Sequence, residues 1–449
     1  MAMNNIELVG FKKVVLDLVN NDKRQFAFDL LDYFFSKATS LYEFDVLGEL
    51  ALKTEYRDLH LKCAERAHAI ACTSEHKRSS RNNLINAYNT MNYPEKALDY
   101  IEIQLAQTPD DFDTLCRKAA NVSLLGHKKA SEKIIDDLIQ KYPEKASDLE
   151  PMLSSRYLRK GELAKGVATF VEPVKKESDL FVKQLGMKRW DGQSYPGKTV
   201  YIEGEGGIGD EIINVRFLKN IKDLGMRPIL CSPDNKFYRD KNNLFRRHGI
   251  EVLNESFSID KSQYWTSMMS LPAVLNLTED DLWTDTYLKP MQNQKNKIQG
   301  GKFKIGIKCS GNPFFAQDEY RKIPLDLMVL YLPENAELYY IDKQKVDHPR
   351  VHNVAGMISS WEDTLDIVDQ MDCIVSSCTS LVHIAGAIGK TTFVSVPIAE
   401  YYIWTSSSTD HSTPWYGDNF HVMKQTQLRD WNQPLAQISE KVNYMMKNQ

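Results

Sequence analysis

A glycine-rich segment between a strand pattern and a helix pattern carries the clearest chemical signal in the sequence. The segment GEGGIGDE covers residues 204–211, after the apolar run 198–203 and before a helical pattern over 210–224. Glycine lets a main chain approach a ligand closely, and the first turn of a helix offers N–H groups to an anion. The expected ligand-binding turn contains Gly206, Gly207 and Gly209.

An aspartate also stands in this turn, where a loop built only for phosphate would avoid negative charge. A carboxylate held in a cleft can take a proton from a reacting hydroxyl, so Asp210 is the candidate catalytic base. Aspartate also commonly caps the start of a helix, and the sequence leaves both roles open for Asp210.

A second polar segment, CSGNPFFAQDEYRKIP, follows the strand pattern KIGIK and covers residues 309–324. It combines a polar strand end with two adjacent cations. This combination suits a diphosphate at the carboxyl edge of a parallel sheet. The candidate anion-binding residues are Ser310, Asn312, Arg321 and Lys322.

A third segment, SSCTSLVHIAGAIGK, covers residues 376–390 and brings small polar residues to the start of a helix pattern. Hydroxyl groups and helix N–H groups together favour phosphate. The candidates here are Cys378, Thr379, Ser380 and His383. A structural role stays open for His383, because a lone histidine on a helix more often belongs to the core.

The part of the chain that precedes these segments is expected to be helical. Amphipathic patterns separated by short breaks run from about residue 5 to 176. Four alanines recur at about one tetratricopeptide (TPR) repeat length, and a small residue is needed where two helices of a hairpin cross. These alanines are Ala64, Ala97, Ala130 and Ala164. Degenerate TPR-like hairpins are therefore predicted.

Strand patterns alternate with helix patterns after the glycines and proline of 186–198. The order of strand, glycine turn, helix and strand is typical of a parallel α/β sheet, and a second such set begins at 302. The fold class is thus α + α/β, with two Rossmann-like lobes and a ligand cleft between them. The expected domains are a helical repeat domain at 1–190, a first lobe at 191–300 and a second lobe at 301–449.

Composition and charge exclude several function classes. The 449 residues exceed the roughly 250–300 that one core organises, so two or three domains are expected. A net charge of −4 argues against non-specific nucleic-acid binding by the chain as a whole. A basic stretch over 151–190 could face an anionic partner or form a solvated helix face.

Cysteine usage and the start of the chain point to the cytoplasm. Seven scattered cysteines without a CxxC pair fit a reducing compartment and argue against structural zinc. The first residues lack a signal-peptide pattern, and no run of about 18 apolar residues predicts a membrane span.

Four segments together resemble a known family. GEGGIGDEIINVRFL, CSGNPFFAQDEYRKIPLDLM, SSWEDTLDIVDQMDCIVSSCTSLVHIAGAIGK and STPWYGDNFHVMKQ, in this order, resemble the glycosyltransferase half of bacterial TPR-containing proteins related to the heptosyltransferases of glycosyltransferase family 9. The resemblance spans about residues 199–442. It implies a GT-B fold and metal-independent, inverting transfer from a nucleotide sugar that the second lobe binds.

The resemblance also implies roles for single residues. Asp210 falls on the catalytic base, while Ser310, Arg321 with Lys322, Thr379 and His383 fall on positions near the donor diphosphate. The sequence departs from the family at Cys378, where the pattern has an aspartate that contacts the donor sugar region. A second departure is Cys309, in place of a tryptophan.

The expected function is transfer of a sugar from a nucleotide-diphosphate sugar to an acceptor hydroxyl, without a metal or other cofactor. By analogy with O-GlcNAc transferase, the helical repeats would present a protein acceptor. A DNA base and a saccharide or lipid-linked acceptor are the other candidates. The alternative is a non-catalytic TPR/GT-B scaffold, which Cys378 favours, and nucleotide-sugar epimerase chemistry is a third possibility. The sequence leaves the sugar, the nucleotide and the oligomeric state open.

Overall fold

The computed structural model describes residues 5–21, 23–178, 185–232, 239–253, 259–312, 315, 317–408 and 410–448, with side chains in these ranges apart from 5–9, 172–178 and 294. The chain divides into two compact units. One comprises Met1–Glu144 with Phe314–Glu319, and the other comprises Lys145–Pro313 with Tyr320–Gln449.

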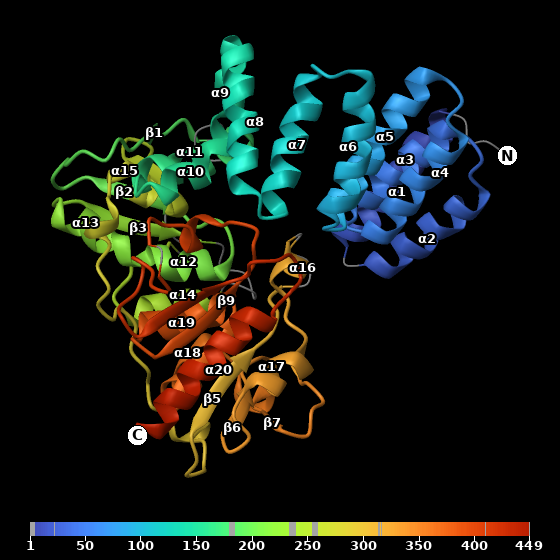
Figure 1. Cartoon of the computed structure of the whole chain (residues 1–449). Coiled ribbons are helices and arrows are strands. Elements are labelled where there is room, and N and C mark those ends of the chain that lie inside the picture. The colour runs from blue at the N-terminus through green and yellow to red at the C-terminus, as the bar shows by residue number, and fades with distance from the viewer. Residues whose placement is uncertain are drawn as a thin grey trace. The chain divides into compact units, whose positions relative to one another are not determined.

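The main segment of the first unit forms a succession of helices (Figure 1), as the sequence predicts. Each helix packs against the next. Side chains of Ser40, Thr73 and Asp111 accept hydrogen bonds from backbone N–H groups at the starts of three of them, which is the usual N-cap arrangement. The helices are α1 (Asn5–Asn20), α2 (Arg24–Lys37), α3 (Leu41–Lys53), α4 (Arg57–Ile70), α5 (Ser74–Thr90), α6 (Pro94–Gln107), α7 (Phe112–Leu124) and α8 (Lys128–Lys141).

The recurring alanines of these helices differ in their packing. Ala97 and Ala64 are buried, as a close crossing of helices requires. Ala130 is exposed, and the adjacent Ser131 takes the buried place and donates a 2.7 Å hydrogen bond to the carbonyl of Ala119. The steric role predicted for Ala130 is therefore wrong, because the helix presents the next residue to its neighbour. TPR identity stays a prediction.

The second unit contains two parallel sheets, of which the first has the strand order β1-β4-β2-β3. β2 carries the glycine-rich turn at its carboxyl end and lies between β3 and β4. The strand predicted at 198–203 is present as β2, and β1 and β4 were not predicted. The strands are β1 (Lys188–Arg189), β2 (Thr199–Glu203), β3 (Arg227–Cys231) and β4 (Tyr264–Ser267). The helices are α12 (Ile208–Asn214), α13 (Leu218–Asp223), α14 (Arg239–Arg247) and α15 (Leu271–Val274).

The second sheet has six parallel strands in the order β10-β9-β8-β5-β6-β7. This is the doubly wound order of a Rossmann fold, with its switch point between β5 and β8. The strands are β5 (Lys304–Lys308), β6 (Glu337–Tyr340), β7 (Val351–Asn353), β8 (Cys373–Ser377), β9 (Thr392–Val396) and β10 (Phe420–Lys424). The helices are α16 (Asp318–Arg321), α17 (Leu325–Tyr331), α18 (Trp361–Asp369), α19 (Ser380–Ala387) and α20 (Asn432–Lys447).

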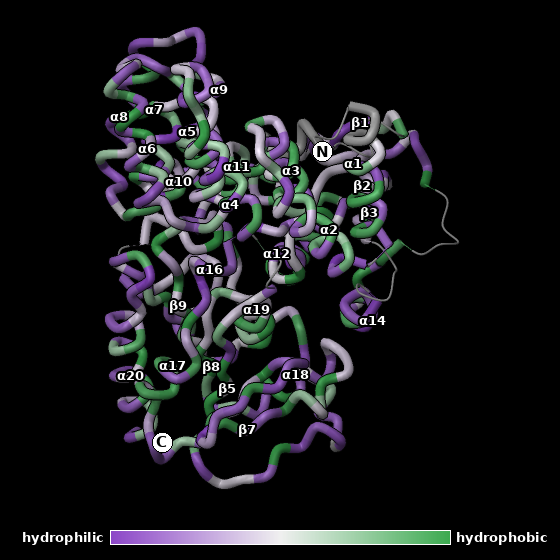
Figure 2. The backbone as a smooth tube through the Cα atoms, turned by 90° about the vertical axis from the view of Figure 1, so that its right-hand side faces the viewer, coloured by the Kyte–Doolittle hydropathy of each residue, from purple (hydrophilic) through white to green (hydrophobic). Residues whose placement is uncertain are grey.

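Both faces of the second sheet are covered. Cys373 and Val375 pack with α17 and α20, whereas the intervening Ile374 packs with α18 and α19. Parallel sheets buried on both faces have continuous apolar strands, and Figure 2 shows hydrophobic segments at β5 and β8, while α20 alternates hydrophilic and hydrophobic residues. The two sheets with their helices confirm the predicted α/β lobes.

Three further helices, α9 (Ala146–Leu149), α10 (Ser154–Arg159) and α11 (Leu163–Ser178), belong to the second unit. Apolar side chains of α10 and α11 share a core with β2. Gly166 allows the two helices to approach, since a Cβ there would lie 2.5 Å from Cγ of Leu158. In the basic stretch 151–190, Arg159 forms an ion pair with Glu400, and Lys183 lies outside the described residues.

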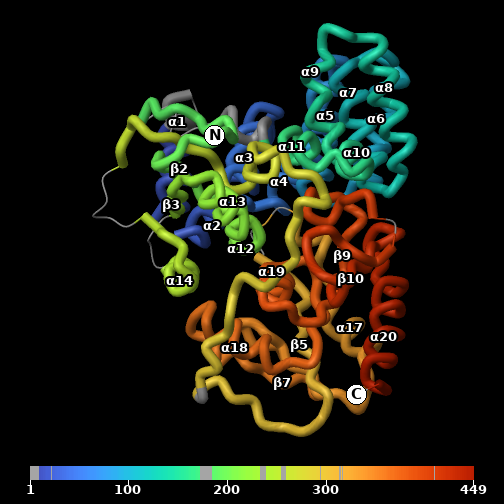
Figure 3. Tube along the Cα trace, turned by 90° about the vertical axis from the view of Figure 1, so that its left-hand side faces the viewer, coloured from blue at the N-terminus to red at the C-terminus, as the bar shows by residue number. Residues whose placement is uncertain are grey.

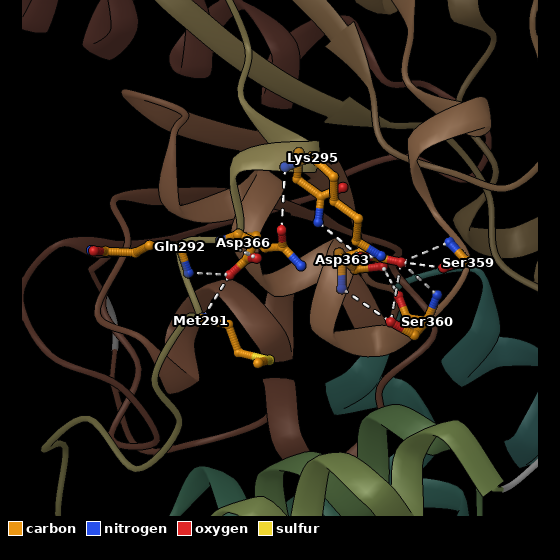
Figure 4. A network of polar contacts seen from close by, with 10 residues as sticks. Met291, Gln292, Lys295, Ser359, Ser360, Asp363 and Asp366 are labelled. Atoms are coloured by element: carbon orange, nitrogen blue, oxygen red, sulfur yellow. Dashed lines mark hydrogen bonds and ion pairs between the residues drawn. The ribbon is translucent and has the colours of Figure 1, made fainter.

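Hydrogen bonds hold the segment that joins the two lobes against α18 (Figure 4). Asp366 accepts hydrogen bonds from the backbone N–H groups of Met291, Gln292 and Asn293 at 2.6, 2.8 and 2.9 Å. One turn earlier, Asp363 pairs with Lys295 at 2.6 Å. Two carboxylates of one helix thus fix the path by which the chain enters the second lobe.

Helices long and apolar enough to cross a membrane are absent from the part of the chain that the structure describes.

Candidate active site

The side chain of Asp210 folds back onto the main chain of the glycine-rich turn that precedes it. The N–H of Gly207 donates a 2.8 Å hydrogen bond to Oδ2 of Asp210. Gly206 has a φ of +75°, and a Cβ at this position would lie 2.9 Å from that same oxygen and 2.9 Å from Sδ of Met269. The turn therefore needs glycine at 206 for its conformation and for space. The N-cap residue of α12 is Gly207, and Asp210 lies at the third position of the helix, from which Oδ2 reaches back to the N–H of the N-cap residue.

The other carboxylate oxygen of Asp210 faces the second lobe. Oδ1 accepts a 2.6 Å hydrogen bond from the hydroxyl of Tyr401, which follows β9. Burial raises the pKa of Asp210 above its usual value, because the charged form loses water. Hydrogen bonds from Tyr401 and Gly207, and the positive charge of Arg321, oppose that rise. The result is a carboxylate with a stronger affinity for a proton than an exposed aspartate has.

A buried ion pair lies beside this turn. Lys241 and Glu211 are almost fully buried and form an ion pair, and Nζ of Lys241 also donates a 2.9 Å hydrogen bond to Ser232. Burial raises the pKa of Glu211 and lowers that of Lys241, while each partner's charge opposes the shift. A Cβ at Gly204 would lie 2.9 Å from Oε1 of Glu211, so glycine there leaves room for the pair.

Helices α12 and α19 lie side by side (Figure 3), and Gly209 is at their contact. A Cβ at Gly209 would lie 2.7 Å from Cδ2 of His383 and 3.4 Å from Cα of Ser380. His383 is buried, and its ring stacks on Trp404 at a centroid distance of 5.3 Å. Burial and the positive charges of Arg216 and Arg321 lower the pKa of His383 to about 3, so the imidazole is neutral at physiological pH.

The cationic residue of the second segment also reaches this region. Nη1 of Arg321 donates a 2.9 Å hydrogen bond to the carbonyl of Cys378, immediately before Thr379. Thr379 is buried, precedes the first residue of α19, and lies 3.4 Å through its hydroxyl from that of Ser376. Arg321, the last residue of α16, therefore lies beside Thr379 at the carboxyl end of β8, which is one of the two strands at the switch point of the sheet.

The other candidate anion-binding residues have fewer contacts that tie them to this region. Ser310 is half-buried and Asn312 is exposed, and both lie just past the end of β5. The side chain of Lys322 is exposed, while its carbonyl accepts a 2.9 Å hydrogen bond from Nε1 of Trp431. The structure thus brings Asp210, Gly209, Arg321, Thr379 and His383 into one region more clearly than it does these three.

Several residues of the site were missed in the sequence. Tyr401 orients the carboxylate, Tyr416 lies 2.8 Å through its hydroxyl from Nδ1 of His383, and the buried Arg216 lies close to both lobes' aromatic residues. Of these three residues, only Tyr401 could have been found from its position in the sequence. It closely follows the strand 392–396, and ligand-binding residues of parallel sheets gather after strand ends. Nothing in the local pattern marks Arg216 or Tyr416.

Clusters of three or more histidine, cysteine, aspartate or glutamate residues that could hold a metal ion do not occur among the described residues.

Comparisons with known proteins were made by sequence and by structure. The sequence matches no protein-family model and no curated protein. The chain is similar to the solved structure of E. coli ADP-heptose LPS heptosyltransferase II, with 12% identity and a TM-score of 0.37 over 56% of this chain and 99% of that one. It is also similar to the iron-containing dodecameric glycosyltransferase TibC of enterotoxigenic E. coli, with 10% identity and a TM-score of 0.38 over 57% and 77%. For a family 9 glycosyltransferase of Veillonella parvula the identity is 8% and the TM-score is 0.31, over 57% and 91%.

Proposed function

We propose that this protein is a glycosyltransferase that moves a sugar from a nucleotide-diphosphate sugar to an acceptor hydroxyl, with inversion and without a metal ion. The observation that carries this proposal is the meeting of Asp210, in the glycine-rich turn of one Rossmann-like lobe, with Arg321 and His383 of the other. A proton acceptor and groups suited to a diphosphate therefore share one region.

Asp210 would act as the base. Its carboxylate takes the proton of the acceptor hydroxyl while that oxygen forms a bond to the anomeric carbon of the donor. The bond from that carbon to the diphosphate oxygen breaks at the same time, and the nucleoside diphosphate leaves. The raised pKa of Asp210 suits this role, because a base with a higher proton affinity takes the proton more readily near neutral pH.

The second lobe would meet the charge of the leaving diphosphate. The start of the eight-residue helix α19 supplies N–H groups and the positive end of its dipole. Arg321 approaches the same helix start through the carbonyl of Cys378 and adds a full positive charge. Neutral His383 can add one N–H donor.

A non-catalytic scaffold is the second candidate function. Cys378 favours it, because the family pattern has an acidic residue there. Asp210 with its partner Tyr401, and Arg321 beside α19, favour the enzyme. The acceptor is proposed to be a protein, a DNA base or a saccharide.

A ligand screen tests the donor part of the proposal. Thermal shifts of the full chain are measured with UDP, GDP, ADP, CMP and their common sugar conjugates, with and without magnesium. We expect stabilisation by one nucleotide class in the absence of magnesium. Absence of any shift would favour the scaffold.

An Asp210→Asn variant tests the catalytic part. The amide keeps the size of the side chain and an acceptor oxygen for Tyr401 but cannot take up the proton. Transfer, or slow hydrolysis of the donor found in the screen, is expected to fall by about 10²–10⁴ while nucleotide binding persists. Normal transfer by this variant would remove Asp210 from the mechanism.

A further inference from the structure

The ring of His383 has its two edges in different surroundings. Nδ1 lies 2.8 Å from the hydroxyl oxygen of Tyr416. The opposite edge faces the glycine-rich turn, where a Cβ at Gly209 would lie 2.7 Å from Cδ2 and 3.4 Å from Nε2. Nδ1 is therefore committed to Tyr416, and Nε2 is the nitrogen on the side of the proposed reaction centre.

Packing fixes the position of the Tyr416 hydroxyl. Tyr416 is buried, and its ring stacks on Phe420 at a centroid distance of 4.3 Å. A Cβ at Gly386 would lie 2.3 Å from the ring, so α19 presents glycine where the tyrosine passes. The guanidinium of Arg216 lies 5.0 Å from the centre of the same ring. Moving the hydroxyl away from His383 would require repacking of all three neighbours.

Arg216 is a buried cation with its own hydrogen bonds satisfied. Its guanidinium donates to the carbonyls of Ile213, Trp415 and Trp283 at 2.8, 2.7 and 3.1 Å. It also donates to the hydroxyl of Tyr287 at 3.3 Å. A second positive charge close to this cation is unfavourable, which is one reason why the pKa of His383 is lowered to about 3, after burial.

A neutral imidazole carries one N–H, and the hydrogen bond at one nitrogen decides which nitrogen that is. Burial raises the pKa of Tyr416 well above 10, so its hydroxyl keeps its hydrogen and can donate it. If Tyr416 donates to Nδ1, the ring proton must be on Nε2.

We infer that Tyr416 is a positioning residue that donates its hydroxyl hydrogen to Nδ1 of His383 and so holds His383 as the neutral, Nε2-protonated tautomer. The Nε2–H group then points toward the turn that carries Asp210 and is the donor for an oxygen of the leaving diphosphate. This last step rests on the proposed function, whereas the tautomer does not.

Nitrogen NMR of the full chain tests the tautomer directly. The protein is labelled with ¹⁵N-histidine, and the signal of His383 is assigned by its loss in a His383→Asn variant. We expect wild-type His383 to carry its proton on Nε2 at neutral pH. Protonation on Nδ1 would overturn the inference, and this measurement needs no folded Tyr416 variant and no substrate.

A Tyr416→Phe variant tests the positioning role, with Tyr331→Phe as its control. Phenylalanine keeps the stacked ring and removes only the hydroxyl. Tyr331 also loses one hydrogen bond, a 3.0 Å contact to Asn432, at a half-buried site on α17 away from His383. We expect the Nε2 preference of His383 to weaken in Tyr416→Phe, and the affinity for the nucleoside diphosphate found by screening UDP, GDP and ADP to fall about 5- to 10-fold.

The outcomes separate this inference from the proposed function. A changed tautomer in Tyr416→Phe, with no nucleotide bound even by wild type, supports the positioning and removes the transferase assignment. An unchanged tautomer and equal nucleotide affinity in both proteins overturn the positioning and leave the transferase standing. Tyr331→Phe is expected to match wild type in both measurements.

Discussion

The hydroxyl of Tyr401 donates a 2.6 Å hydrogen bond to Oδ1 of Asp210 across 191 positions of the sequence. Because Gly207 already donates to Oδ2, both carboxylate oxygens have fixed directions. Phe170 of α11 packs edge-on against Tyr401 at 5.4 Å, so the orienting tyrosine is itself supported. Asp210 is thus held from both lobes, and its orientation depends on their being together.

A Tyr401→Phe variant should shift the pH dependence of transfer. In the proposed reaction Asp210 can take up a proton only when it is ionised, so activity is expected to be lost as the pH falls through its pKa. The hydrogen bond from Tyr401 favours the ionised form, and its removal should raise the pKa of Asp210 further. The acid limb of kcat/KM is therefore expected to move to higher pH, measured between pH 5 and 9. An unmoved limb would mean that Asp210 is not the titrating base.

A Lys241→Met variant should leave the buried carboxylate of Glu211 without its cationic partner. Removing one partner of a buried ion pair costs about 3–5 kcal/mol of unfolding free energy, measured by urea denaturation at pH 8. Without Lys241, Glu211 would have a raised pKa in the folded state and would take up a proton there as the pH falls. The loss of unfolding free energy should therefore become smaller as the pH falls toward the unfolded-state pKa of about 4.3. The double variant with Glu211→Leu should recover most of the stability. Equal losses at pH 5 and pH 8 would contradict this explanation.

A Gly209→Ala variant should disturb the contact between α12 and α19. The new methyl group would lie 2.7 Å from His383, which the packed ring cannot accommodate without moving. Crowding of this kind costs about 1–3 kcal/mol, and nucleotide affinity should fall with it. Gly356→Ala is the matched control, because a Cβ there meets no atom within 4 Å. The comparison is made by thermal unfolding and by titration of the nucleotide.

An Asp366→Ala variant should loosen the segment between the lobes. Three backbone N–H groups lose their acceptor, with an expected cost of about 2 kcal/mol. Limited proteolysis should then cut near residues 291–298 faster than in wild type, while Asp418→Ala, at an exposed position, should leave the rate unchanged. Equal cleavage rates would show that Asp366 does not hold this segment.

Apolar patterns were enough to predict that strands and helices alternate in both lobes of the second unit. The strands at 199–203 and 304–308 are buried runs of the kind that parallel sheets require, and each lies where the sequence predicts it. β4, with the sequence YWTS, was missed because it is short and half polar and so looks like a loop. The exposed Ala130 was misassigned because periodicity of residue type does not fix which side of a helix faces its neighbour.

Contacts across the site could not be read from the sequence. The glycine-rich turn marks Asp210, but its pairing with Tyr401 depends on how two lobes come together over 191 positions. Likewise, Arg216 and Tyr416 belong to ordinary-looking segments, and only their burial and proximity in the fold give them a role. Residue type therefore suggested the chemistry, and long-range packing determines how each group is oriented.

The shared core of α10, α11 and β2 decides where a shortened form of this protein can begin. Leu158, Leu163, Val167 and Val171 are at most 3% exposed, packed in one core with Val200. A fragment starting at residue 191 would leave these positions of the core empty and remove Phe170 from behind Tyr401. One starting at residue 145 would keep them, and is expected to be expressed in folded form where the fragment starting at residue 191 is not.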